Sequence, residues 1–299
     1  MTGTSLSLKL PRMFEFDADT AVLRTGEDSF TAELTDRWNT LAGPNGGYVL
    51  AVVARALSEQ LPMPHPLTIT GHFLRPATPG PAEIRTDLIK SGKRHATGAA
   101  TLSQNGKDVL TVVATFADLK ALHGRTLLLN EPPHLPPAGS LPDPITQIPP
   151  EMLPSIARRV EVRVAELPGF LRGEPSGKPA IDLWVRFTDG REPDPLSLAF
   201  IVDGAAFPVI VEIGEFMSST VELTVHVRAM PAPGWLACRI STRYVEGGYA
   251  EEDFEVWDSA GALVAQSRQL ILIASEGAGA DQRAAPGGLP DNTAYGSRK

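Results

Sequence analysis

The stretch GPNGGYVLAVVARAL, residues 43–57, joins a proline and two adjacent glycines to a run that is apolar on nearly every side. Asn45 is a favourable residue for capping a helix, and glycine lets other groups approach the backbone because it has no Cβ. A helix that is apolar all round must be covered by other elements. The stretch therefore predicts a buried central helix over residues 46–61.

Turn signals divide the chain around this helix into short alternating segments. In the first half, PATPGP, SGKR and QNGKD separate the expected strands, and the last of these is typical of an Asn-Gly hairpin. The second half has the same order, with a strand, a helix over residues 195–210 and four more strands. The expected strands are 30–34, 67–74, 82–91, 95–104, 109–118, 181–187, 220–228, 236–245, 250–257 and 263–273.

An internal repeat explains this order, because self-similarity at a fixed offset indicates duplicated units. A shift of 154 residues places Pro79-Gly80 on Pro233-Gly234, Arg85 on Arg239, and Val109-Leu110 on Leu263-Val264. Each copy is an α+β unit in which an antiparallel sheet wraps a central helix, the hot-dog arrangement. Two such sheets joined edge to edge would form one continuous sheet and remove two exposed edges.

A proline-rich segment separates the two copies. Nine prolines lie between Pro132 and Pro154, and proline both removes backbone donors and restricts the residue before it. We therefore expect an N-terminal unit over residues 1–120, an extended linker over 121–160 and a C-terminal unit over 161–275. The apolar-poor end, 276–299, is predicted to be disordered.

Composition excludes several classes of function. The 299 residues are 42% apolar and 21% charged, with a net charge of −8, which argues against a nucleic-acid partner. No apolar run approaches the roughly 18 residues that a membrane helix needs, and the N-terminus has no secretory pattern, so a cytoplasmic location is expected. Cys238 is the single cysteine, which excludes internal disulfides.

The residues of the first half carry a family resemblance. GPNGGYVLAVVARAL, followed by LTITGHFLRPATPGPAEIRTDLIKSGKRHATGAATLSQNGKDVLTVVATF, resembles the N-terminal half of the double hot-dog acyl-CoA thioesterases of the thioesterase II type. The likeness covers roughly residues 30–118. The second half resembles the family more weakly, in the expected order, and includes the closing strand GALVAQSRQLILI.

The resemblance implies a catalytic set of Asp203, Thr220 and Gln269. Ser219 is an alternative to Thr220, and Gln266 is an alternative to Gln269. The family's Asp-His after the threonine is replaced here by Glu222-Leu223, which puts substrate preference in question more than reaction type.

The residue types suit thioester hydrolysis by water. Asp203 lies in a segment that otherwise lacks charge, so its carboxylate would be desolvated, as groups at functional sites often are. It could activate a water that Thr220 and Gln269 hold. No metal-ligand spacing, P-loop or GxSxG elbow is present, so neither metal nor cofactor is expected.

Two further groups of residues are candidates for substrate binding. Asn45, Gly46 and Gly47 stand where backbone amides at a helix N-terminus could polarise a thioester carbonyl, although a plain asparagine cap explains them equally well. Arg75, Lys93 and Arg94 could meet the phosphates of coenzyme A, or could be solvated turn charges.

Two alternatives to a thioesterase stay open at this point. Hot-dog hydratases resemble this arrangement but carry a histidine about five residues after the helix aspartate, where this chain has Pro208. A non-catalytic acyl-CoA-binding protein could keep the fold and lose turnover. Because hot-dog units associate through their sheets, a homodimer or homotetramer is plausible.

Overall fold

The structure is a computed structural model that describes residues 13–204 and 209–273, so the predicted disordered end lies outside the described residues. Its first half contains α1 (Glu15–Asp19), β1 (Val22–Arg24), β2 (Ser29–Leu34), β3 (Asn39–Thr40), β4 (Gly43–Pro44), α2 (Gly46–Gln60), β5 (His65–Phe73), β6 (Gly80–Ser91), β7 (His95–Gln104) and β8 (Lys107–Ala117). Its second half contains β9 (Val160–Val164), β10 (Ala180–Phe187), α3 (Ser197–Gly204), β11 (Ser218–Val227), β12 (Leu236–Ser241), β13 (Val245–Glu246), β14 (Tyr249–Trp257) and β15 (Leu263–Ile273).

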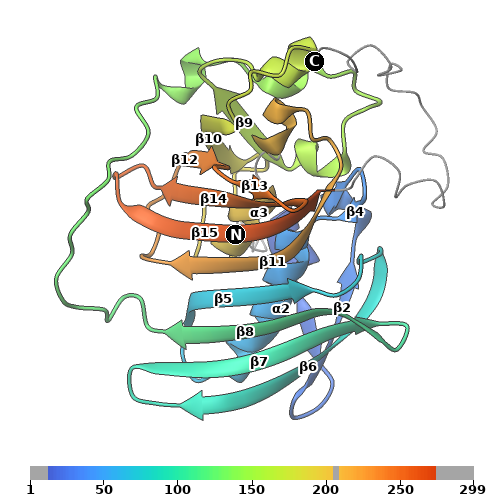
Figure 1. The fold of residues 1–299 in the computed structure, drawn as a ribbon. Helices are drawn as coiled ribbons and strands as arrows, with labels where there is room; N and C mark the ends of the chain where they lie inside the picture. Colours follow the sequence, from blue (N-terminus) through green and yellow to red (C-terminus); the bar gives the residue numbers. More distant parts are fainter. Residues whose placement is uncertain (1–12, 205–208, 274–299) are drawn as a thin grey trace, which may run out of the picture.

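One antiparallel sheet of 13 strands runs through both halves (Figure 1). Its order is β1-β2-β6-β7-β8-β5-β11-β15-β14-β12-β10-β9, and β13 pairs with β14. The halves meet where β5 pairs with β11, so the predicted continuous sheet is confirmed. This junction pairs the backbone groups of two strands that would otherwise be exposed edges.

The junction also reveals the symmetry of the repeat. Thr70 on β5 lies opposite Thr224 on β11, and their hydroxyl oxygens are 2.9 Å apart. These two threonines are separated by the repeat offset itself, so each residue pairs with its own counterpart. Gly80, the first residue of β6, and Gly234, two residues before the equivalent strand β12, both adopt positive φ, 127° and 109°. Two copies of one unit are thus related by an approximate two-fold axis at the junction.

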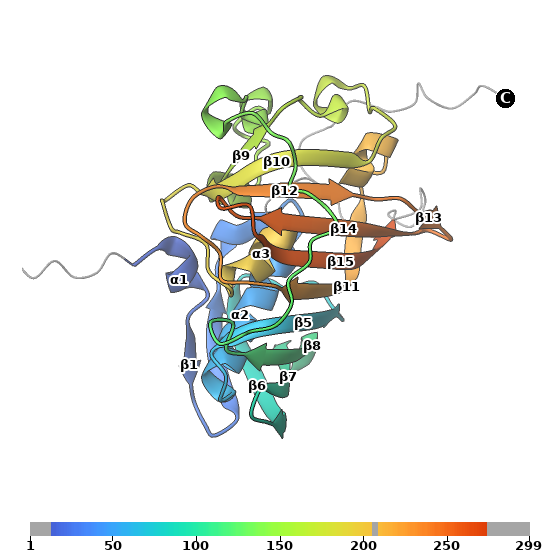
Figure 2. The ribbon, with the colours of Figure 1, turned by 90° about the vertical axis from the view of Figure 1, so that its left-hand side faces the viewer.

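The two central helices lie on the same face of the sheet, with α1 and β1 on their other side (Figure 2). In α2 the residues from Gly47 to Ala54 are all buried, and α2 packs directly against α3. The predicted double hot-dog architecture is confirmed. Among the described residues, no helix combines the length and the apolar character needed to cross a membrane.

Two expectations for the second half need correction. The helix expected over 195–210 is α3, which ends at Gly204, and the description resumes in the 3-10 turn η6 (Val209–Ile213). Glycine is a poor helix residue, and a proline at position 208 lacks the amide that a continuing helix would use. Strand β9 was not predicted, because its five residues follow directly on the proline-rich segment.

Candidate active site

Asp203 is held at the point where the two central helices meet. Its Oδ2 accepts hydrogen bonds from the Gly47 amide at 2.6 Å and from Asn45 Nδ2 at 2.7 Å. The same Asn45 caps α2, because its Oδ1 accepts the amide of Tyr48 at 2.9 Å, which confirms the predicted cap. The N-terminal unit therefore orients a carboxylate that belongs to the C-terminal unit.

Gly47 allows this close approach of the helices. A Cβ at this position would lie 2.8 Å from the Asp203 Cβ, 3.0 Å from the carbonyl oxygen of Phe200 and 3.1 Å from that of Ala199. Both carbonyls are backbone atoms of α3 and cannot rotate away. The sequence left open whether the Gly47 amide could polarise a substrate carbonyl or simply belonged to a capped helix start, and the structure pairs that amide with Asp203.

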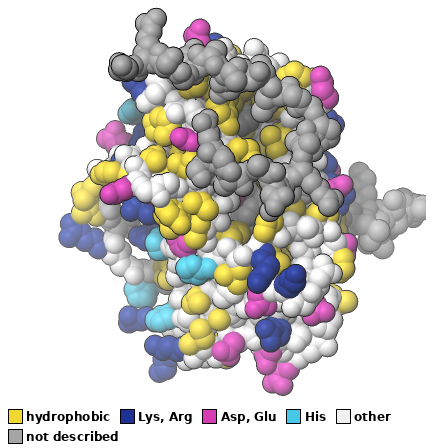
Figure 3. Space-filling model, turned by 45° about the vertical axis from the view of Figure 1, so that its right-hand side comes forward, with side chains coloured by type: hydrophobic (Ala, Val, Ile, Leu, Met, Phe, Trp, Pro, Cys, Tyr) yellow, Lys and Arg dark blue, Asp and Glu magenta, His cyan; other side chains and the backbone are white. Residues whose placement is uncertain are grey.

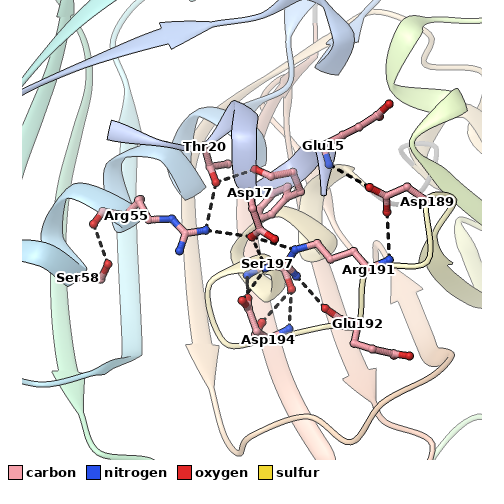
Figure 4. A network of polar contacts seen from close by, with 11 residues as sticks. Glu15, Asp17, Thr20, Arg55, Ser58, Asp189, Arg191, Glu192, Asp194 and Ser197 are labelled. Carbon is pink, nitrogen blue, oxygen red and sulfur yellow. Dashed lines mark hydrogen bonds and ion pairs between the residues drawn. The ribbon is translucent and has the colours of Figure 1, made fainter. Parts of the chain in front are cut away.

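A polar network fixes the start of α3 (Figure 4). Asp194 and Ser197 cap each other, since the Ser197 amide donates to Asp194 Oδ1 at 2.7 Å and the Asp194 amide donates to Ser197 Oγ at 2.9 Å. The Arg191 guanidinium, which is 6% exposed, pairs with Asp194 at 2.6 Å and with Asp17 of α1 at 2.7 Å. The N-terminal helix thus helps to place the helix that carries Asp203.

Thr220, Gln269 and Glu252 form a hydrogen-bonded chain across three neighbouring strands. The Thr220 hydroxyl of β11 donates to Gln269 Oε1 of β15 at 2.9 Å, and Gln269 Nε2 donates to Glu252 Oε1 of β14 at 2.8 Å. The other oxygen of Glu252 accepts the Val209 amide at 2.9 Å. Because α3 lies against β11, β14 and β15, this chain faces the helix of Asp203.

The carboxyl groups of Asp203 and Glu252 both have raised pKa values. Desolvation by the surrounding protein raises the pKa of Asp203, and the hydrogen bonds from Gly47 and Asn45 oppose that shift. Desolvation raises the pKa of Glu252 to about 7, the Asp203 charge adds to it, and the bonds from Val209 and Gln269 oppose it. Two carboxyls of elevated pKa thus lie near one another, as at many sites of acid-base chemistry.

Sequence reasoning missed Glu252. The segment YAEEDFEVW alternates, and the buried side of β14 consists of Ala250, Glu252, Phe254 and Val256. A charged residue at an inward position of an alternating strand was therefore the signal that could have revealed it.

The structure distinguishes between the alternative site residues. Ser219 is exposed, whereas Thr220 reaches Gln269. Gln266 lies opposite His226 and Glu255 in the sheet, away from this chain of hydrogen bonds. Thr220 and Gln269 are the pair that the fold brings together.

The three basic residues predicted to bind phosphates are not brought together. Arg75 follows the end of β5, where its Nη1 donates to the Asp108 carbonyl at 2.6 Å. Lys93 and Arg94 lie in the turn between β6 and β7, at the opposite end of these antiparallel strands. On the face shown in Figure 3, lysine and arginine side chains lie in separate places, beside histidines along the left edge and beside acidic side chains on the right. The expected basic cluster does not form within one chain, because strands of about ten residues hold its members roughly 30 Å apart.

A cavity of about 480 Å³ opens beside the hydrogen-bonded chain. It lies between β9, β10, the 3-10 turn η5 (Gly169–Arg172) and η6, and its walls include Val164, Leu183 and Val209. Val209 also donates its amide to Glu252, so the cavity adjoins the polar site.

Comparison with known proteins now identifies the family. Residues 34–117 match the acyl-CoA thioesterase N-terminal domain, and residues 132–273 match the acyl-CoA thioesterase C-terminal domain. The chain belongs to the acyl-CoA thioesterase family.

Solved structures and sequence relatives of this thioesterase-family protein match most of its length. A structure described as a thioesterase II from Thermobifida fusca is 32% identical, with a TM-score of 0.79, over 89% of this chain and 99% of that one. A hot-dog protein of unknown function from Alicyclobacillus acidocaldarius is 24% identical, with a TM-score of 0.77, over 88% and 99% of the two chains, and shows the fold. An uncharacterized protein of Mycobacterium tuberculosis is 28% identical over 83% of this chain and 91% of its own length.

Proposed function

We propose that the protein hydrolyses acyl-CoA thioesters to a free acid and coenzyme A by direct attack of water. The observation that carries this proposal is the setting of Asp203. Its carboxylate is fixed by donors from α2 and faces strands that present a hydroxyl and an amide. Family membership supports the same reaction class.

In the proposed mechanism, Asp203 acts as the general base. Among the described residues, its hydrogen bonds from Gly47 and Asn45 both go to Oδ2, so Oδ1 is available to a water molecule. The Thr220 hydroxyl donates its proton to Gln269, which leaves its oxygen lone pairs to accept the second hydrogen of that water. The raised pKa of Asp203 makes it a stronger base than an ordinary aspartate.

The chemical steps balance without a covalent intermediate. Asp203 takes a proton as the water oxygen bonds to the thioester carbon, and the carbonyl oxygen becomes an oxyanion. The oxyanion then collapses, the carbon–sulfur bond breaks, and the thiolate receives the proton from Asp203. The amide of Gly46 is our candidate oxyanion donor, because the first amides of a helix have no intrahelical partner.

We assign the acyl chain to the cavity beside Val209. Val164, Leu183 and Val209 give part of its wall an apolar surface that suits a hydrocarbon chain, and Val209 joins this wall to Glu252 of the polar site.

The test is thiol release from acyl-CoA esters of graded length, measured for the wild type and for Asp203→Asn. We expect turnover by the wild type and a loss of about 100-fold or more in the variant, as for removal of a positioned base. Equal and negligible release by both proteins at every length would leave the non-catalytic binding protein as the better interpretation. Light scattering on the same preparation tests the expected dimer or tetramer.

A further inference from the structure

Glu252 carries a carboxyl group that is buried in the protein, where an apolar side chain would pack equally well. Its residue is 6% exposed, and each of its oxygens accepts one N–H, from Gln269 and from Val209. An ionised carboxylate has no proton to donate. Gln269 must therefore turn its NH2 group toward Glu252, which points Oε1 at Thr220 and makes the Thr220 hydroxyl a donor to it.

We propose that Glu252 is a positioning residue of this site: its carboxylate fixes the Gln269 amide, and through it the Thr220 hydroxyl, in the orientation that receives the attacking water. This inference rests on the proposed hydrolysis. It makes the direction of the hydrogen bonds, and not merely their presence, a requirement for turnover.

The other unit shows that the fold itself does not require polar residues here. In the second unit, Glu252 of β14 lies opposite Gln269 of β15. At the equivalent place in the first unit, Gly98 of β7 lies opposite Ala114 of β8. A Cβ on Gly98 would lie 2.9 Å from a methyl carbon of Leu61, which follows α2, and 3.3 Å from one of Leu57 in α2, so apolar side chains cover that position. In the second unit, the described residues of α3 lie against β14 and β15, and the polar pair Glu252 and Gln269 stands at the position that Gly98 and Ala114 hold in the first unit.

The surroundings of Glu252 let its carboxyl gain or lose a proton near neutral pH, which would change the direction of its hydrogen bonds. Burial raises the pKa of Glu252 to about 7, and the charge of Asp203 on α3 adds to the increase. Arg268, next to Gln269, is 61% exposed and pairs with Asp253 instead. Glu212, on η6 with Val209, accepts the amides of Phe170 and Ser176. Protonated Glu252 could donate to Gln269 and reverse the chain of hydrogen bonds.

The first experiment replaces Glu252 by glutamine, which has the same shape but carries an NH2 group. In this variant the new amide oxygen would accept the Val209 N–H, and the new NH2 group would point toward Gln269. The Gln269 amide would have to turn over to present its oxygen to that NH2 group. Its own NH2 group would then point toward the Thr220 hydroxyl, which would accept a hydrogen bond instead of donating one. We expect kcat to fall about 10- to 100-fold, as for loss of a residue that orients a reacting group, with KM nearly unchanged. The part of the fall of wild-type kcat that comes from protonation of Glu252 near pH 7 should also disappear from the variant's profile, whereas the fall caused by protonation of the base Asp203 stays. Glu255→Gln, on the same strand but paired with Arg239, is the matched control and should behave as wild type.

The second experiment does not depend on turnover. Gln269→Glu alone would place a second carboxylate against that of Glu252. We expect this repulsion to lower the midpoint of thermal unfolding by several degrees. The double variant Glu252→Gln with Gln269→Glu restores a donor facing an acceptor, and should recover most of that loss. Additive midpoint changes, or wild-type kcat and pH profile in Glu252→Gln, would overturn the assignment. An inactive wild type would overturn the proposed hydrolysis instead, and the midpoint cycle would still decide the Glu252 pairing.

Discussion

Replacing Gly47 by alanine tests whether the crossing of α2 and α3 builds the site. The added Cβ would lie 2.8 Å from the Asp203 Cβ and 3.0 and 3.1 Å from two backbone carbonyl oxygens of α3. Overpacking of this kind costs about 1–3 kcal/mol. Alanine would return about 1 kcal/mol through its better helix propensity, so the expected net loss of unfolding free energy is about 0–2 kcal/mol.

The effect on activity should exceed the effect on stability. Separation of the helices stretches the 2.6 Å bond from the Gly47 amide to Asp203 and moves the proposed base. A displacement approaching 1 Å can reduce turnover about 100-fold. The assays are urea unfolding and thiol release from an acyl-CoA ester, both on the folded variant.

Two other glycines serve as comparisons. At Gly46 the added Cβ would lie 3.1 Å from the Phe73 ring, a side chain that can turn, and 3.3 Å from Asp203 Oδ2, so a smaller loss of unfolding free energy is expected. At Gly139 nothing lies within 4 Å, and alanine should be neutral. If Gly47→Ala kept the stability and kcat of the Gly139→Ala control, the reasoning about the helix crossing would be refuted.

Three further predictions concern charge and the cavity. The folded-state pKa of Glu252 is raised from 4.5 to about 7, so wild-type unfolding free energy should decline by about 3 kcal/mol as pH rises through that window, at 1.36 kcal/mol per unit. Urea titrations at several pH values should show a smaller decline in Glu252→Gln than in the wild type. Equal slopes of unfolding free energy against pH in the two proteins would contradict this prediction. Arg191→Met should cost about 1–3 kcal/mol by removing the cation that Asp17 and Asp194 share, because both carboxylates stay partly solvated and Asp17 keeps Arg55; urea unfolding measures this, and Arg125→Met is the exposed control. Ala165→Phe, at the rim of the cavity, should lower kcat/KM about 10-fold for long acyl chains and leave short ones unchanged, which the same thiol assay measures; an equal effect on both would argue against the cavity as the acyl site.

Much of the fold was predictable because its signals are local. The apolar run after Asn45 predicted α2 within one residue of its observed end, and alternation with Asn-Gly and Pro-Gly turns predicted most strands. The repeat offset predicted that two units would share a sheet, and Thr70 opposite Thr224 confirmed it. Resemblance pointed to Asp203, Thr220 and Gln269, and the last two prove to be hydrogen-bonded to each other.

The sequence by itself determined the elements, their order and their duplication, because periodicity, caps and turn residues act over a few positions. Only the tertiary structure decided which groups meet. It turned the Gly47 amide to Asp203, separated Lys93 and Arg94 from Arg75, and placed Glu252 behind Gln269. These contacts join residues that lie far apart in the chain, and they depend on helix crossing, strand register and the early end of α3, none of which a local pattern encodes.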